Sequence, residues 1–421
     1  MLPNRSGGAT RIAGSGRADE AIGRGMARVG DDSERLLSGE AWRDFCDRLK
    51  ASGDAILAEG FPTAPGDRAE GFRWLSRLIV HAVQLEVEAG DTRHPVFIRY
   101  ETPHNQWGGP NPDNVYLRAQ VDPSRTYRIW ADVRGVRQAI FSLNEGEMQL
   151  GEYGVFGECS LDDFALDADG RLEFWLSPDE RPRNWMKADP RGRLLTIRIY
   201  QSDWETDAAP VFHIERVGGE GVPPPFAEPA RIGRALDRAA NWVERTARFW
   251  NAYTTAGFAR ATPNVAAAPR PAPGGADNIL YGSCFWDLAD DEVLLLECDT
   301  PDARYFGFTL HTLGWLESGD FADRQTSLSG HQLHRDGDGR IRVVLSAGDP
   351  GTPNWIDIGG RPRGLLVYRW VWARDNPVPS ATRCPRGELR DRLPRDHPAV
   401  DAATRRTILA RRREAAWNRF Q

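Results

Sequence analysis

The sequence has few of the features by which common enzyme classes and membrane proteins are recognised. Its five cysteines, Cys46, Cys159, Cys284, Cys298 and Cys384, are scattered and form no C-x-x-C pair. This spacing argues against a disulfide framework and a structural zinc site, and it favours a reducing compartment, so we expect a cytoplasmic protein. The longest apolar run, GLLVYRWVWA, is too short to cross a bilayer, so we expect no membrane partner.

Charge and motif content exclude further classes. The net charge is −6, with 54 basic and 60 acidic residues in 421, so no excess of positive charge predicts nucleic-acid binding. The chain has no Walker A loop, no strand-linked G-x-G-x-x-G and no G-x-S-x-G elbow. We expect neither a cofactor nor a metal site. The glycine- and arginine-rich residues 1–33 are predicted to be a disordered tail, with Met26 as an alternative start.

Hydrophobic periodicity divides the rest of the chain into helical and β-rich segments. Apolar residues recur at helical spacing in residues 34–92 and again within 218–276, where a Gly/Pro-rich linker precedes the helix. Short alternating runs rich in Val, Ile, Tyr and Phe predict strands in residues 93–217 and 277–378. Residues 379–421 are predicted to end in a helix with an exposed basic face.

The two β-rich segments repeat each other. A D-x-D-G-R turn, an alternating apolar run and an Asn-Trp pair occur from Asp167 to Trp185 and again from Asp336 to Trp355. Other matched residues keep one order at offsets of 164 to 171, which indicates an internal duplication. They are Asp113 with Asp277, Ile140 with Gly307, Ser160 with Ser327, and Arg198 with Arg369. We therefore predict an α+β protein with two tandem homologous β-sandwich or jelly-roll-like modules.

Features that occur in both copies are interpreted as scaffold. Asp-Gly between two alternating runs is typical of a tight hairpin, whereas a calcium loop needs an oxygen ligand where Arg171 and Arg340 stand. Asn184 and Asn354 are predicted to cap the loop backbone.

Two repeated arginines have more than one interpretation. Arg198 and Arg369 stand among apolar residues in predicted strands, and a buried guanidinium needs a partner. Asp113 and Asp277 are the predicted partners in a repeated ion pair. Alternatively, Arg369 holds an anionic substituent of a ligand.

The positions at which the copies differ are the guide to a site, because both copies keep what each needs for folding. Three of the eight histidines, His311, His331 and His334, lie within 24 residues of the second copy. His311 and His331, together with Glu317, are the candidates for general acid–base catalysis. No metal-binding spacing is present, and a structural role for each histidine stays open.

Substrate-binding candidates come from one long loop and from the same window of the second copy. Trp107 and Asp113 stand in YETPHNQWGGPNPDN, and long irregular loops at a sandwich rim often carry binding groups. Trp107 and Trp315 are predicted to line a pocket, with Arg369 as the anion-binding residue.

Three stretches of the chain also carry a family resemblance. They are WGGPNPDNVYLRAQVDPSRTYRI, LLTIRIYQSDWETDAAP, and the region from RYFGFTLH to DPGTPNWID. They resemble the bacterial DUF1214 family, a domain of unknown function that is often paired with a DUF1254 region. The resemblance extends from about Trp42 to Ala373 and implies jelly-roll-like sandwiches, but no catalytic residue. Arg361 departs from it, since the family pattern has a histidine there.

These patterns predict a cofactor-independent lyase, hydrolase or isomerase for a small, fairly apolar organic molecule. One alternative is a non-catalytic β-sandwich that binds carbohydrates or other small ligands, because exposed tryptophans stack on sugar rings. Another is a structural or oligomerisation role, and a homo-oligomer is compatible with each hypothesis.

Overall fold

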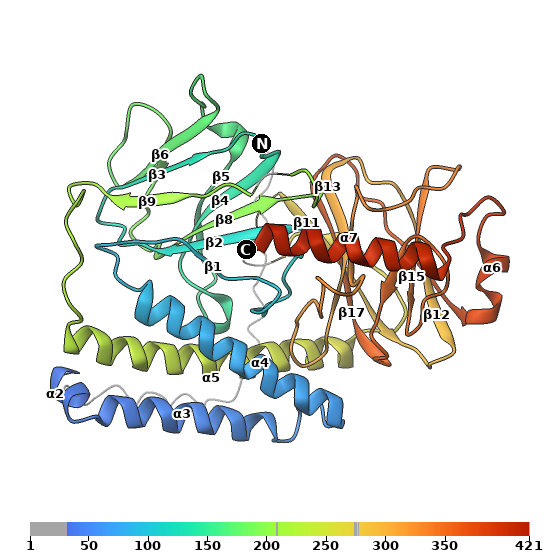
Figure 1. Cartoon of the computed structure of the whole chain (residues 1–421), viewed down its shortest axis with the longest axis horizontal. Coiled ribbons are helices and arrows are strands. Elements are labelled where there is room, and N and C mark those ends of the chain that lie inside the picture. Colours follow the sequence, from blue (N-terminus) through green and yellow to red (C-terminus); the bar gives the residue numbers. More distant parts are fainter. Residues whose placement is uncertain (1–31, 208, 273–275, 277, 421) are drawn as a thin grey trace, which may run out of the picture.

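The computed structural model describes residues 32–207, 209–272, 276 and 278–420. Nearly all of the predicted tail, including Met26, lies outside these residues. The described chain forms four β-sheets with helices along one side and a C-terminal helix across the front (Figure 1). The predicted α+β fold with two tandem sandwich modules is confirmed. No helix in the described ranges is long and apolar enough to span a membrane.

The helices and strands have the following bounds. The α-helices are α2 (Asp32–Leu37), α3 (Glu40–Ile56), α4 (Pro65–Val83), α5 (Pro229–Arg260), α6 (Leu389–Arg392) and α7 (Ala402–Phe420). The strands of the first module are β1 (Ile98–Arg99), β2 (Asn114–Gln120), β3 (Tyr127–Asp132), β4 (Gln138–Asn144), β5 (Val155–Ser160), β6 (Arg171–Ser177), β7 (Trp185–Lys187), β8 (Leu194–Tyr200) and β9 (His213–Arg216). Those of the second module are β10 (Ala267–Arg270), β11 (Ile279–Asp287), β12 (Glu292–Asp299), β13 (Ala303–His311), β14 (Ser327–Ser329), β15 (Arg340–Ser346), β16 (Trp355–Asp357), β17 (Arg363–Ala373) and β18 (Ser380–Pro385).

Both modules have the same strand order. In the first, the sheet β1-β2-β8-β4-β5 packs on the sheet β7-β6-β3-β9. In the second, β10-β11-β17-β13-β14 packs on β16-β15-β12-β18, so each strand has its equivalent nine labels later. The pairs β6–β7 and β15–β16 are parallel, also at equivalent positions. This correspondence is the structural result of the duplication that the sequence markers predict.

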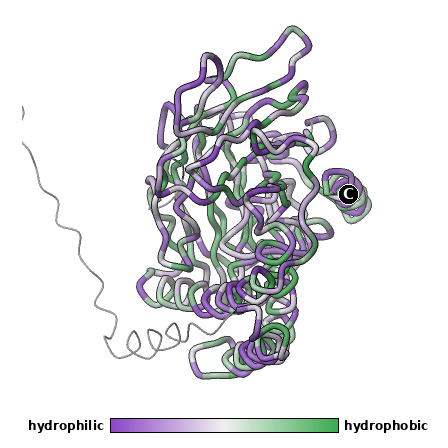
Figure 2. Tube along the Cα trace, turned by 90° about the vertical axis from the view of Figure 1, so that its left-hand side faces the viewer, coloured by the Kyte–Doolittle hydropathy of each residue, from purple (hydrophilic) through white to green (hydrophobic). Residues whose placement is uncertain are grey.

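Each module has its own apolar core between its two sheets, because alternate side chains of every strand point inward. In the first core, Phe141 meets Phe164 and Phe174 edge to face, at centroid distances of 5.2 and 5.3 Å. In the second, Phe308 and Trp370 make the same kind of contact at 5.5 Å. Figure 2 shows the apolar residues gathered inside the body, with α7 seen end-on at its surface.

The repeated Asn-Trp element is confirmed as scaffold. Asn184 exchanges hydrogen bonds of 2.7 and 2.8 Å with the backbone of Ala165 and donates another to the carbonyl of Glu173 at 2.9 Å. Asn354 makes the same three bonds one module later. Its partners are His334 and Arg342.

The D-x-D-G elements form tight turns, as predicted. Gly170 and Gly339 have φ angles of 76° and 78°, the left-handed conformation for which glycine is suited. A turn of this kind leads straight into β6 in the first module and into β15 in the second.

The second module extends further than the sequence predicts. β10 lies within the predicted linker but pairs with β11, and β18 lies after residue 378 but pairs with β12. Their sequences, AAPR and SATRCP, contain proline and lack an apolar alternation, which is common in strands at sheet edges.

The prediction of an exposed basic face on α7 is wrong for three of its arginines. Arg405, Arg412 and Arg419, seven residues apart, are buried against the second module and the module boundary. Arg412 donates hydrogen bonds to the carbonyl of Phe321 at 2.6 Å and to the carbonyl and hydroxyl oxygens of Ser327 at 3.0 and 2.8 Å. The helix therefore docks through buried charged groups as well as through Ala415 and Ala416, which pack in an apolar cluster with Trp204 and Phe321.

Replacing Arg412 should weaken this docking. Arg412→Ala leaves two backbone carbonyls without their donor, so we expect a loss of about 2–4 kcal/mol. Amide hydrogen exchange should show faster exchange throughout α7. The exposed neighbouring substitution Arg411→Ala is the matched control and should change stability by less than about 0.5 kcal/mol. Equal effects of the two substitutions would contradict docking through the buried arginine.

Candidate functional site

The two modules meet through the outer faces of their five-stranded sheets. Tyr200 at the end of β8 packs on Tyr305 of β13, with ring centroids 4.8 Å apart. Ile140, Ile279 and Val371 complete a small apolar cluster between the modules. This boundary is buried, so any polar group placed there needs a partner.

Two equivalent Tyr–Arg pairs lie at this boundary. Tyr116 of β2 stands opposite Arg198 of β8, and Tyr281 of β11 stands opposite Arg369 of β17. Arg198 interacts electrostatically with Tyr281 of the other module, and Arg369 does so with Tyr116. The duplication thus brings two cationic groups and two phenols together from equivalent strands.

Neither Arg198 nor Arg369 forms the predicted ion pair with Asp113 among the described residues. Arg369 Nη2 donates to the carbonyl of Gly109 at 2.7 Å, and its Nη1 has no hydrogen-bond partner among the described residues. Arg198 Nη1 donates to Ser142 Oγ at 3.1 Å. Asp277 lies outside the described residues.

Asp113 has a structural role instead of the predicted substrate contact. Its carboxylate accepts hydrogen bonds from the Tyr305 hydroxyl at 2.6 Å and from Trp204 Nε1 at 2.7 Å. It is also the acidic group facing Arg412 and Arg419 of α7, whose guanidinium groups lie over the Trp204 ring. Burial lowers the pKa of Arg412 to about 9 and that of Arg419 to about 10, and Asp113 opposes both shifts.

Glu101 is the buried carboxyl group of the site. Burial raises its pKa well above the usual range, although Arg118, the Trp107 amide and Arg369 oppose the shift. Its Oε2 atom has no hydrogen-bond partner among the described residues. The raised pKa favours the protonated form of this carboxyl group, and its Oε2 is available for a ligand.

His311 is the matching base. Burial, with Arg369 nearby, lowers the pKa of this fully buried imidazole well below its usual value, so it is neutral. Nδ1 lies 3.4 Å from Ser318 Oγ. The Ser318 hydroxyl donates its hydrogen bond to the carbonyl of Pro110 at 2.7 Å. Nδ1 therefore carries the ring proton, and a hydrogen bond to the Glu317 backbone agrees with this. Nε2 keeps its lone pair and has no partner among the described residues.

The Gly109–Pro110 part of the long loop brings these groups together. The Gly109 carbonyl binds Arg369, and a Cβ on Gly109 would lie 3.7 Å from His311 Nε2. Gly109 has a φ angle of 75°, so the loop takes a left-handed conformation here that a larger residue would strain. The groups of this loop that lie at the site are the Gly109 backbone and Glu101. The side chains that the sequence predicts for binding, Trp107 and Asp113, have structural roles instead.

The predicted catalytic set of His311, Glu317 and His331 does not come together. Gly307 pairs with Ser329, so His311 lies about 13 Å along β13 from the strand end after which the His331 turn begins, at ~3.3 Å per residue. His331 is exposed, and its Nε2 lies 3.5 Å from an Asp203 carboxylate oxygen. Glu317 is buried and forms an ion pair with Arg77 of α4, so its carboxylate already has a partner.

The two predicted pocket tryptophans belong to the core beneath the helices. Trp315 is fully buried between Phe61 and Trp74, at centroid distances of 5.7 and 5.4 Å. Trp107 packs behind Tyr100 at 5.6 Å and is likewise buried. They support the site from behind and present no open face for a sugar ring.

A narrow pocket leads to Glu101. It is a shallow crevice that is too small to hold a water molecule in this conformation. Its wall consists of Glu101, Thr102, Pro110, Asn111, Pro112, Asn114, Phe321 and Phe420. Phe420 is the last described residue of α7, so the docked helix covers this approach.

Several residues of the site were missed by the sequence predictions. Glu101 is a single charge next to a predicted strand, Arg118 is a single charge within one, and Tyr100 looks like an ordinary strand residue. Arg118 nevertheless lies 3.9 Å over the Tyr100 ring and pairs with Glu147. The one available signal was the recurrence of a tyrosine opposite each repeated arginine. Among the described residues, no three His, Cys, Asp or Glu side chains gather as possible metal ligands.

The similarity to one solved structure is decisive for the family. An uncharacterized protein from Burkholderia cenocepacia superposes with a TM-score of 0.80 at 31% sequence identity, covering 85% of this chain and 100% of the other. The chain belongs to the family of this protein. The family shares the two-module fold, because the match extends over the other chain's whole length.

Other comparisons add little. The VPA0106 protein from Vibrio parahaemolyticus matches with a TM-score of 0.41 at 12% identity, covering 74% of this chain and 98% of the other. No protein-family model and no curated protein matches the chain. The DUF1214 resemblance stays a prediction.

His81 of α4 is a second buried imidazole next to the site. It lies between Trp107 at 4.3 Å and Trp242 at 5.0 Å, and neither ring nitrogen has a partner among the described residues. Burial and the charge of Arg118 lower its pKa well below the usual value. The ring packs as a neutral aromatic group.

This burial makes stability depend on pH. Below the unfolded-state pKa of about 6.5, the unfolded chain binds a proton at His81 that the folded protein excludes, so the free energy of unfolding falls on acidification. The contribution is at most about 1.4 kcal/mol per pH unit. In His81→Phe, urea unfolding should lose less stability between pH 6.5 and 5 than the wild type, by up to ~2 kcal/mol. Parallel pH profiles for the two proteins would contradict this role of His81.

Proposed function

We propose that the inter-module site binds a small organic anion and that Glu101 and His311 transfer protons on it. The chain would then be an enzyme of the lyase, hydrolase or isomerase type. The observation that supports this most is that one carboxyl oxygen of Glu101, Nε2 of His311 and Nη1 of Arg369, all buried around one loop, have no hydrogen-bond partner among the described residues. Buried polar groups are normally hydrogen-bonded, so three exceptions in one place indicate a missing ligand.

The roles follow from the protonation states. Glu101, whose pKa is raised, is the general acid, and neutral His311 is the general base through Nε2. Two titratable groups whose environments push their pKa values in opposite directions can hold and remove a proton at the same pH. His311 abstracts a proton from the substrate, and Glu101 donates one to it.

Arg369 is the proposed anchor for the anionic group of the substrate. Its Nη1 is buried without a hydrogen-bond partner in the part of the chain that the structure describes, and guanidinium groups bind carboxylates with good geometry. Tyr100 and Tyr116, with ring centroids 5.2 Å apart, would contact the apolar part of the ligand. A small carboxylate with an aliphatic or aromatic body fits these two requirements.

A non-catalytic ligand-binding protein is the second candidate. Arg369 and the tyrosines would serve it equally, whereas the pairing of an acid with a base would then have no chemical role. Binding and proton transfer therefore have to be measured separately.

Binding should depend on Arg369. A panel of small carboxylates, tested at pH 7 by thermal shift and calorimetry, should contain ligands that raise the melting temperature, because a ligand that binds only the folded state stabilises it. Arg369→Gln should weaken their binding at least tenfold. The matched control Arg324→Gln, which removes a partly exposed ion pair with Asp357, should bind as the wild type does. Equal affinity in Arg369→Gln would overturn the anion site.

Proton transfer should depend on Glu101 and His311. Ligands found by the panel, incubated in D₂O and followed by NMR, should exchange a carbon-bound proton or form product. Glu101→Gln and His311→Gln should keep binding within about tenfold and lower the rate by about 100-fold or more. If the wild type binds ligands but neither exchanges nor converts them, the catalytic proposal fails and the binding protein remains.

A further inference from the structure

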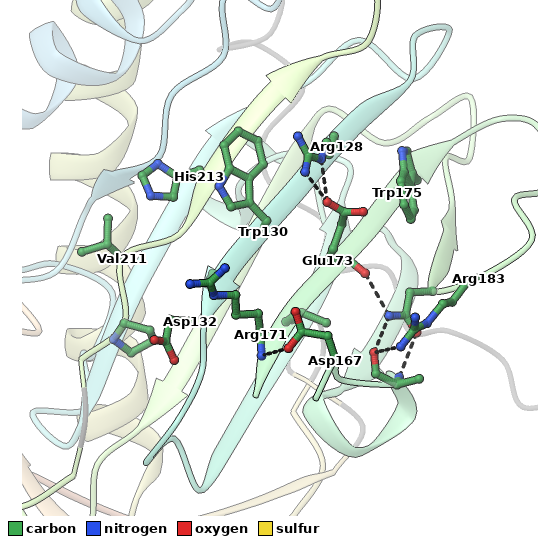
Figure 3. Close-up of a pocket in the computed structure, with 15 residues that line it drawn as sticks. Arg128, Trp130, Asp132, Asp167, Arg171, Glu173, Trp175, Arg183, Val211 and His213 are labelled. Atoms are coloured by element: carbon green, nitrogen blue, oxygen red, sulfur yellow. Dashed lines mark hydrogen bonds and ion pairs between the residues drawn. The ribbon is translucent and has the colours of Figure 1, made fainter. Parts of the chain in front are cut away.

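The outer face of the four-stranded sheet in the first module carries a second concave surface (Figure 3). Its volume is about 810 Å³, within the range of small-ligand sites. It is lined mainly by β3, β6 and β9, together with the loops that carry Ala165, Arg183 and Val211. We call this surface the β3–β6 face.

The second module does not have an equivalent surface. The strand registers place Arg128 and Trp175 of the first module where the second has Leu295 and Val344. Leu295 and Val344 are buried in a cluster with side chains of the C-terminal segment. These are Cys384, Leu389 and Leu393. The same sheet face is therefore closed by apolar contacts in one module and open, aromatic and charged in the other.

Two indoles lie on the β3–β6 face. Trp130 packs against His213, with nearly parallel rings 5.2 Å apart, and the Arg128 guanidinium lies 4.8 Å from the Trp130 ring centre. Trp175 stands on the neighbouring strand, beyond the ion pair of Arg128 with Glu173. Both indoles are only partly buried. Aromatic groups next to hydrogen-bonding side chains suit a ligand with apolar and polar faces.

Arg171 has no close ion-pair partner among the described residues, although it interacts electrostatically with Asp132, which stands opposite it on β3. Figure 3 shows its side chain extending along the sheet toward Trp130 and Val211, and it makes no ion pair among the described residues. Its equivalent in the second module, Arg340, lies 3.3 Å from Asp299 and 3.9 Å from Glu297. Arg183 donates a hydrogen bond to the carbonyl of Leu166 in the loop before β6, and Arg128 is paired with Glu173. A carboxylate on the ligand would give the Arg171 guanidinium an ion-pair partner.

We infer that the β3–β6 face binds an acidic oligosaccharide. A pyranose ring has C–H groups that pack on an indole and hydroxyl groups that bond to carboxylate and guanidinium side chains. Trp175 supplies the indole, Glu173 accepts from hydroxyl groups, and Arg171 binds the carboxylate of a uronic acid. This surface is separate from the inter-module site, since it lies on the opposite side of the first module's core from β2 and β8.

The test uses the whole chain with a trisaccharide of galacturonic acid, and with maltotriose as a neutral trisaccharide. Calorimetry and tryptophan fluorescence should detect the uronate trisaccharide and show at least tenfold weaker binding of maltotriose. Trp175→Ala should weaken uronate binding at least tenfold. Arg171→Gln should do the same and abolish the preference over maltotriose. Arg340→Gln, at the equivalent position of the second module, is the matched control and should bind as the wild type does.

Three results would overturn the inference. The first is the absence of uronate binding in the wild type, and the second is uronate binding that both Trp175→Ala and Arg171→Gln leave unchanged. The third is a dimer in sedimentation experiments that Trp175→Ala dissociates, because a second copy of the chain would then occupy the face. Circular dichroism and melting temperatures of both variants should match the wild type, since neither side chain is buried in a core.

Discussion

Buried positive charge is the constraint on which the arrangement of this protein depends. Arg198 and Arg369 lie on equivalent strands that are central to their sheets, and both point toward the boundary between the modules. A guanidinium taken out of water costs several kcal/mol unless hydrogen bonds and opposite charge replace the hydration. At Arg369 the chain supplies one backbone carbonyl and neighbouring phenols, and it leaves one nitrogen unpartnered among the described residues. This incompletely paired charge at the boundary is the reason for proposing an anion site there.

Duplication explains why the cationic part of the site occurs in two equivalent copies and the rest of the site does not. Each copy contributes a tyrosine opposite an arginine, so the cationic part is doubled without any new element. The acid and the base are not doubled, because Glu101 comes from the segment before β2 and His311 from the end of β13, where the first copy has Asn144 at the end of β4. The proposed acid and base are different residue types, so the proposed mechanism requires divergence after duplication. The β3–β6 face follows the same pattern, since one copy kept an apolar cover and the other did not.

The sequence predicted the scaffold better than the site because the two leave different traces. A hairpin, an asparagine cap and an apolar alternation are local, so their residues recur in both copies and can be matched. The groups around Arg369 come from segments more than 200 residues apart, and their contacts include backbone atoms such as the Gly109 carbonyl. The histidine window found one residue of the site, His311, but closeness in sequence did not bring His331 to it. Charge is also ambiguous in sequence, as the buried arginines of α7 show.

The docking of α7 affects both the stability of the protein and the access of a ligand to the pocket at Glu101. Asp113 accepts hydrogen bonds from Tyr305 and Trp204 while it faces Arg412 and Arg419, so one carboxylate connects the first module's loop, the second module and the C-terminal helix. The same docking holds Phe420 against the narrow pocket at Glu101. A ligand that enters there binds only when the helix end has moved, and its apparent affinity then falls by the fraction of molecules in that open state. In the proposed mechanism, interactions that strengthen α7 docking therefore lower the apparent affinity for such a ligand, so the buried arginines affect both stability and binding.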